Sequence, residues 1–131
     1  MTCRWPEAGV TAPQPETLVE EAAFRLLREG TRFTLSGDVD AGAAARVLQA
    51  LEEKAGGGEA AELLLDEAEI IGGPAAARMV DAVRLLLDRF ARLRLVRAPQ
   101  ALAHTLYRVG MLQPGSRLEL IAPREEEGRA S

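Results

Sequence analysis

The chain has 131 residues, of which 47% are hydrophobic and 27% charged, and it carries a formal net charge of −4. These values fit one globular domain and exclude a disordered or collagen-like chain. Apolar runs such as Leu63–Leu65 are far shorter than the ~20 residues that cross a bilayer, and the acidic balance argues against general nucleic-acid binding.

The two ends of the chain differ in composition from its middle. Residues 1–17 contain three prolines and few large apolar groups, which predicts a flexible leader. The first residues lack the apolar centre of an export signal, so we expect a cytoplasmic location. Cys3 is the only cysteine, which excludes an internal disulfide and a cysteine-based metal site. Residues 123–131 predict a polar tail, which places the folded domain between 18 and 122.

The segment from 17 to 30 is compatible with two structures. Apolar residues recur at helical spacing from Leu18 to Leu27, and Thr17 with Glu20 fits a capping box. The alternation over 24–35 instead fits a hairpin that turns near Gly30. The sequence pattern alone leaves both alternatives open.

A helix and a buried strand follow. Asp40 is a suitable N-cap, and the helix after it ends at Gly56–Gly58. Its apolar residues form one stripe, made of Ala44, Val47, Leu48, Leu51 and Ala55. The run Glu62–Asp66 is typical of a buried parallel strand, and a loop is expected over Ile70–Pro74. Pro74 suits the first turn of the next helix.

The second half of the chain continues this alternation. A helix is predicted over about 75–91, with one apolar stripe made of Met79, Val80, Val83, Leu86, Leu87 and Phe90. A strand is predicted over Leu93–Arg97. A short helix then begins after Pro99 and ends at Gly110, and its buried residues are Leu102, Leu106 and Val109. A last strand is predicted over Arg117–Ile121. The order predicts an α/β (α+β) fold, a mixed sheet of four to five strands with three to four helices packed on it.

Charge is unevenly distributed along the chain. Seven acidic residues and one lysine lie between Glu52 and Glu69, whereas six arginines and two aspartates lie between Arg78 and Arg97. Adjacent blocks of opposite sign either steer a protein partner or form two solvated faces.

Catalytic and ligand-binding patterns are missing from the sequence. His104 is the only histidine, no Gly-x-Ser-x-Gly motif is present, and we expect His104 to be structural or at the surface. The run Gly56–Gly58 follows a helix, whereas a phosphate cradle precedes one. We therefore predict a chain that is not an enzyme and that uses no metal or cofactor.

Four fragments, in order and with matching spacing, resemble the STAS domain, which is the fold of bacterial anti-sigma factor antagonists and of sulfate-transporter tails. They are Leu35–Asp40, Leu64–Asp66, Ile71–Ala75 and Leu93–Leu112. The resemblance covers residues 22 to 122. It implies a strand at about 22–28, and a short helix ahead of that strand would accommodate the helical pattern as well.

The chain departs from the family at the loop before the long helix. In the antagonists this loop typically reads Asp-Ser-Ser-Gly, and a kinase phosphorylates one serine. Here the matching stretch is Gly72–Ala75, and no Ser, Thr or Tyr occurs between Gly37 and His104. The resemblance thus implies a protein-binding module without a phosphorylation switch.

Three functions remain open at this stage. The first is a regulator that binds an anti-sigma factor or a related kinase-like ATPase. The alternative is a small STAS subunit that binds and supports the ATPase of an ABC transporter of the phospholipid-trafficking type. A nucleotide- or lipid-binding domain is a third. The sequence does not indicate the oligomeric state.

The resemblance and the helical pattern mark different candidate contacts. The region through which the family binds partners corresponds to Gly72, Gly73, Pro74, Ala75 and Arg78. Leu85 lies roughly opposite the apolar stripe of its helix, so it is a candidate exposed anchor. Asp38 and Asp40 match the family's strand-end motif, and a capping role is favoured for Asp40.

Overall fold

The computed structural model describes residues 15–124 of the chain. Its first three strands, β1 (Glu16–Glu20), β2 (Phe24–Glu29) and β3 (Arg32–Val39), form two consecutive antiparallel hairpins. Short turns join them, and each strand alternates between buried apolar and exposed polar side chains.

The rest of the sheet is parallel and grows by one strand after each helix. The elements are α2 (Ala41–Lys54), β4 (Gly58–Ile70), α3 (Gly73–Arg89), β5 (Phe90–Val96), α4 (Gln100–Arg108) and β6 (Leu118–Ile121). β3, β4, β5 and β6 pair in parallel, so the spatial order of the six strands is the same as their order in the chain.

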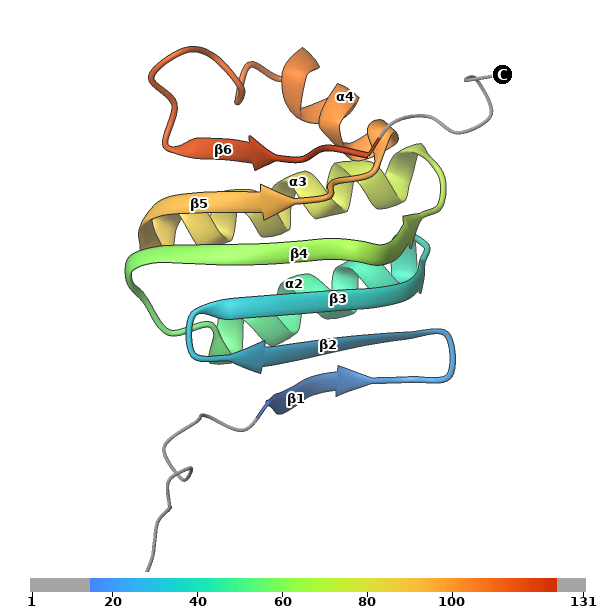
Figure 1. Cartoon of the computed structure of the whole chain (residues 1–131). Helices are drawn as coiled ribbons and strands as arrows, with labels where there is room; N and C mark the ends of the chain where they lie inside the picture. Colours follow the sequence, from blue (N-terminus) through green and yellow to red (C-terminus); the bar gives the residue numbers. More distant parts are fainter. Residues whose placement is uncertain (1–14, 125–131) are drawn as a thin grey trace, which may run out of the picture.

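The three helices form a layer on one face of the sheet, as Figure 1 shows. Each β–α–β connection moves across the sheet in the same direction, and right-handed connections of this kind place their helices on the same side. The core lies between the two layers. Its largest fully buried side chains are Leu26, Phe33, Leu35, Leu51, Leu63, Leu65, Met79, Leu86, Leu93, Leu95, Leu102 and Leu106.

Arginines from other elements cap the carboxyl ends of two helices. Arg89 donates to the Glu52 carbonyl oxygen over 2.9 Å, and Arg28 donates to the carbonyl oxygen of Lys54. Arg117 donates to the carbonyl oxygens of residues 87, 90 and 91, at 2.9, 3.2 and 3.3 Å. The last carbonyls of a helix lack intrahelical partners, so these guanidinium groups satisfy acceptors and complement the helix dipoles.

The predicted fold class is confirmed: the chain is a mixed α/β protein. Between residues 15 and 124 it has three helices, as expected, but six strands where four to five were predicted. The predicted helix starts after Asp40, at Pro74 and after Pro99 are confirmed within two residues. The hairpin turn near Gly30 is also confirmed.

The short helix ahead of the first predicted strand is wrong. Residues Glu16–Glu20 form an additional strand that pairs with β2, and Thr17 lies in it opposite Leu27. The apolar spacing fitted a helix because two short strands joined by the turn at 21–23 bring Leu18, Phe24 and Leu26 to the same buried face. Pairing between strands therefore decides the structure of this segment.

Several predicted boundaries also differ from the structure. α3 ends at Arg89, so Phe90, expected in its apolar stripe, instead begins β5, ahead of the expected strand start at Leu93. β4 runs over Gly58–Ile70 and is longer than the expected Glu62–Asp66, because its first residues pair with β5 and its last residues pair with β3. Val109, expected in the buried stripe of the last helix, is 46% exposed because α4 ends at Arg108. Of the predicted leader, residues 1–14 lie outside the described residues, and Glu16 and Thr17 belong to β1.

The end of the described chain is attached to the sheet. Arg124 forms an ion pair of 3.2 Å with Glu69 and donates to the carbonyl oxygens of Ala68 and Arg97. The other predicted tail residues, 125–131, lie outside the described residues.

Candidate functional site

The carboxyl ends of β3 and β4 bring two predicted site segments together. The Ile71 N–H donates to the Val39 carbonyl oxygen over 2.9 Å, so the loop that enters α3 lies beside the one that enters α2. In Figure 1 both loops are at the right-hand end of the sheet. Asp38 and Asp40 therefore lie at the same edge as Gly72–Pro74, although over 30 residues separate them in the sequence.

Asp40 performs the predicted capping role. Its Oδ1 accepts a 2.8 Å hydrogen bond from the Ala43 N–H, and its backbone has the extended conformation of an N-cap. Asp38 is exposed, and its backbone N–H donates to the Ala23 carbonyl oxygen over 2.8 Å. The two aspartates thus differ, since only the Asp40 carboxylate caps α2.

Asp40→Ala is expected to lower the free energy of unfolding by about 1 kcal/mol, because the Ala43 N–H loses its acceptor. Urea denaturation followed by circular dichroism measures this change. Asp38→Ala is the matched control and should change stability by less than about 0.5 kcal/mol. Equal losses in both variants would contradict the capping assignment.

The docking loop, defined here as Ile71–Pro74, is exposed along its whole length. Gly72 is the N-cap of α3, with φ at 93°, a backbone conformation that side chains disfavour. Ile71 is 51% exposed and is one of three large hydrophobic side chains exposed among residues 15–124. A backbone-rich turn with an adjacent apolar side chain is suited to contact with another protein surface.

The candidate contact residues separate into two groups. Gly72, Gly73 and Pro74 lie in the docking loop, and Arg78 is exposed one turn further along α3. Ala75 is fully buried, so its side chain does not reach a partner. The prediction of an exposed anchor at Leu85 is wrong: this side chain is half-buried and packs against the core. A charge there would disturb the fold itself.

Ile71 is the site residue that sequence reasoning missed. It directly follows the last residue of β4, and the pair Ile70-Ile71 looks like the continuation of an apolar strand. Only Ile70 belongs to the strand; it is half-buried, whereas Ile71 lies beyond the end of β4. The signal in the sequence was a large apolar residue immediately before two glycines.

Parts of the two charge blocks of the sequence lie side by side in the sheet. The acidic residues of β4 and the arginines of β5 lie on paired strands, and Arg97 contacts Asp66 over 3.0 Å. Glu62 similarly lies 3.7 Å from Arg94. The members of the two blocks that lie in or next to β4 and β5 therefore partly neutralise each other.

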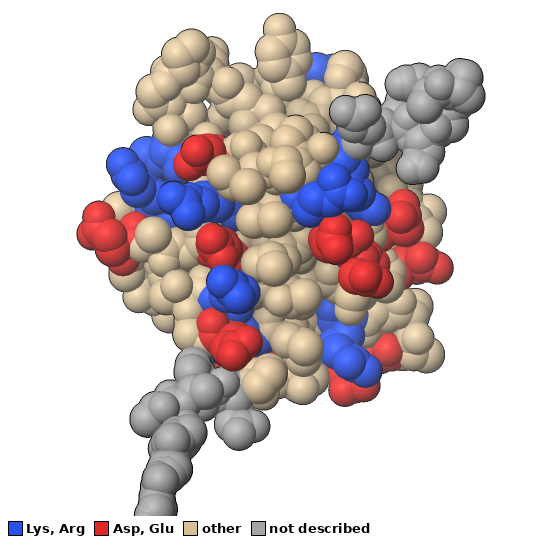
Figure 2. Space-filling model, in the orientation of Figure 1, with Lys and Arg blue, Asp and Glu red and all other residues tan. Residues whose placement is uncertain are grey.

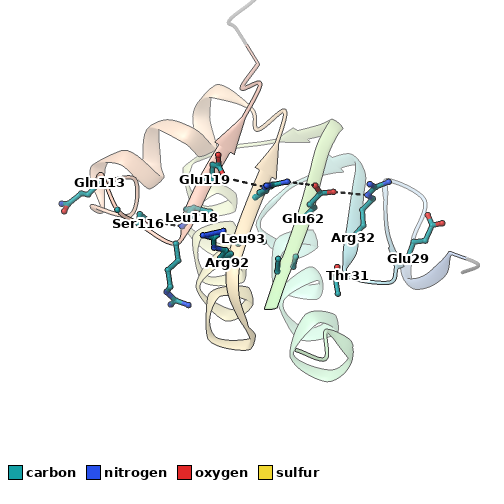
Figure 3. A pocket seen from close by; sticks show the side chains of 15 residues that line it. Glu29, Thr31, Arg32, Glu62, Arg92, Leu93, Gln113, Ser116, Leu118 and Glu119 are labelled. Atoms are coloured by element: carbon teal, nitrogen blue, oxygen red, sulfur yellow. Dashed lines mark hydrogen bonds and ion pairs between the residues drawn. The ribbon is translucent and has the colours of Figure 1, made fainter. Parts of the chain in front are cut away.

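A half-open hollow of about 700 Å³ lies at the opposite end of the sheet, near the amino ends of β4 and β5 (Figure 3). Its lining includes Arg32, Ala60, Glu62, Arg92 and Arg94. None of the residues predicted from the sequence as contacts lines it.

His104 lies at the surface of α4, in agreement with the expectation for it. Among residues 15–124, no group of three or more His, Cys, Asp or Glu side chains is arranged to hold a metal ion. Nor is any helix in this part of the chain long and apolar enough to cross a bilayer. Comparisons with models of protein families, with curated proteins and with solved structures found no match.

Proposed function

We propose that the chain is a non-enzymatic, STAS-like protein-binding module that docks a regulatory partner through the Ile71–Pro74 loop. The observation that carries the proposal is the exposed apolar Ile71 beside two glycines, at the edge where the parallel strands end. The mixed sheet with helices on one face is compatible with this proposal.

The charge around the docking loop supports a protein partner. Asp38 and Asp40 lie on one side of it, and Arg78 lies on the exposed face of α3. An apolar centre with charged residues at its rim is the usual anatomy of a protein interface. We infer an anti-sigma factor or a related kinase-like ATPase as the partner class.

The proposed module is permanently competent to bind. A phosphorylation switch at the start of α3 requires a hydroxyl acceptor, and the sequence has none between Gly37 and His104. Binding would then depend on the amounts of the two proteins and not on covalent modification of this loop.

Ile71→Asp is expected to weaken partner binding about tenfold or more, because it places a charge at the centre of the docking surface. The measurement is affinity purification from a lysate of the native cell, followed by calorimetry with the purified partner. Val109→Asp is the matched control, because it also replaces a half-exposed aliphatic residue but lies at the end of α4.

The outcomes separate the candidate functions. Capture of an anti-sigma factor or a kinase-like ATPase by the wild type and by Val109→Asp, but not by Ile71→Asp, supports the proposal. Capture of an ABC ATPase in the same pattern favours the transporter-subunit alternative. Equal binding by both variants would exclude the loop as the docking surface.

A further inference from the structure

The face of the sheet opposite the helices is uncovered within residues 15–124 (Figure 1). Parallel strands are usually covered on both faces, because their side chains are apolar on both. Here β3 to β6 are parallel, yet all three helices pack on one side. This arrangement leaves one broad surface without a covering layer.

A row of uncharged side chains, apolar except for one threonine and called the apolar row here, crosses the middle of the uncovered face. Strand register aligns Leu27, Thr34, Leu64, Val96 and Ile121. All five side chains are half-buried, and Leu64 lies between two fully buried neighbours that point to the helices. Figure 2 shows this row as an uncharged strip between two groups of charged side chains.

A charged row with alternating sign runs beside the apolar row. Register aligns Glu29, Arg32, Glu62, Arg94 and Glu119 across β2 to β6. Arg32 lies 3.1 Å from Glu62, and Arg94 lies 3.7 Å from both Glu62 and Glu119. Figure 3 shows these contacts as a continuous line.

This alternation makes the row complementary to a second copy of itself. The two-fold axis in question lies between the two facing sheets, runs parallel to the strands and passes between β3 and β4. Rotation about it places β3 of one copy over β4 of the other, and β2 over β5, with each row facing the same row of the second copy. Arg32 then faces Glu62 of the second copy, and Arg94 faces its Glu29. The apolar row is superposed in the same way, with Leu27 over Val96. Arg32, Glu62 and Arg94 keep the ion pairs of their own chain, and all four charges gain an opposite charge from the second copy.

Other two-fold arrangements bring like charges together. An axis through β4 places Glu62 over Glu62 and Arg32 over Arg94. An axis along the apolar row, across the strands, places Glu62 over Asp66 at the acidic end of β4. Repulsion of this kind disfavours a register, so the charges select the axis between β3 and β4.

Two further features fit that axis. Among residues 15–124, Glu29 has no ion-pair partner, whereas the inner members of the charged row do. The same rotation brings the turn at Gly30–Thr31 of one copy over the amino ends of β4 and β5 of the other. That is where the hollow around Ala60 and Arg92 lies.

From this complementarity we propose that two copies of the chain associate through their uncovered sheet faces, about a two-fold axis between β3 and β4. The interface consists of the apolar row and the charged row. The arginines suit it because a planar guanidinium group binds two carboxylates at once. The docking loop stays outside this interface, at the end of the sheet.

The test exchanges charges across the proposed axis. Arg32→Glu places two acids opposite each other in its own dimer, and Glu62→Arg places two arginines opposite each other. Each substitution alone should therefore raise the dissociation constant of the dimer about tenfold or more. In an equimolar mixture of the two variants, a dimer of one chain of each again has opposite charges facing each other across the axis. The glutamate introduced in one chain faces the arginine introduced in the other.

Sedimentation velocity of the full chain, between about 10 µM and about 1 mM, measures the association. The wild type should approach twice the 14.1 kDa chain mass and dissociate as salt rises. Arg84→Glu and Glu53→Arg on exposed helix surfaces are controls with the same charge changes and should leave the wild-type association unchanged. Circular dichroism checks that each variant is folded.

Recovery of the dimer in the mixture, with both single variants folded and monomeric, confirms the proposal. A wild type that is monomeric over the whole concentration range overturns it. A wild-type dimer that neither charge reversal weakens also overturns it, because the interface then lies elsewhere. If one variant unfolds, the pair Arg94→Glu and Glu29→Arg tests the same axis.

Discussion

Gly37→Ala is expected to lower the free energy of unfolding by about 3 kcal/mol or more. Gly37 has φ at +98°, and an added Cβ would lie 2.7 Å from the Phe24 Cα and closer still to the Ala23 carbonyl oxygen. The same carbonyl accepts the Asp38 N–H bond. Two backbone segments would have to separate, so β2 and β3 would lose their pairing at this end of the hairpin.

Gly30→Ala is the matched control for this substitution. Gly30 also has positive φ, at +63°, but an added Cβ would meet nothing within 4 Å. The substitution then acts only through the preference of alanine for negative φ, which lowers the free energy of unfolding by about 1 kcal/mol. Urea denaturation of both variants separates steric contact from backbone strain. Equal losses would contradict the close approach of β2 to Gly37.

Phe33→Ala is expected to lower the free energy of unfolding by about 3–5 kcal/mol. Phe33 is fully buried on β3, and its ring meets that of Phe90 edge-on, with 6.3 Å between centroids. Truncation leaves a cavity between the sheet and the helices and removes the aromatic contact. The measurement is the midpoint of urea denaturation. If the fold is retained, the slope of the unfolding free energy against urea concentration should stay unchanged.

Tyr107→Ala is the control for Phe33→Ala, because Tyr107 is 71% exposed on α4. It should change stability by less than about 0.5 kcal/mol. A loss in Phe33→Ala no larger than that of Tyr107→Ala would mean that the residue does not lie at the centre of the core.

Local signals explain what could be predicted from the sequence. The helix starts at Asp40 and Pro74 and the stop at Gly110 depend on a few adjacent residues, so they could be recognised without the rest of the fold. Strand β1 depends on pairing with β2, and the extra length of β4 depends on pairing with β3 at one end and with β5 at the other. No local pattern contains that information.

The candidate site was predicted less completely than the fold. The loop at Gly72–Pro74 was found through a resemblance and not from its own chemistry. Leu85 was misplaced because α3 is the middle helix of its layer and contacts α2, α4 and the sheet. More of its circumference is therefore buried than the single apolar stripe indicates. The uncovered sheet face was invisible in the sequence, because Leu63–Leu65 suggested a strand buried on both sides.

The identity of strand order and chain order has a consequence for biosynthesis. Each strand pairs with the one made just before it, so no early segment must wait for a distant later one. As the polypeptide leaves the ribosome, every completed strand–helix unit finds its docking edge already formed. The nascent sheet is thus able to grow outward from its amino-terminal hairpins, one strand at a time, because each new strand pairs at the edge formed just before it.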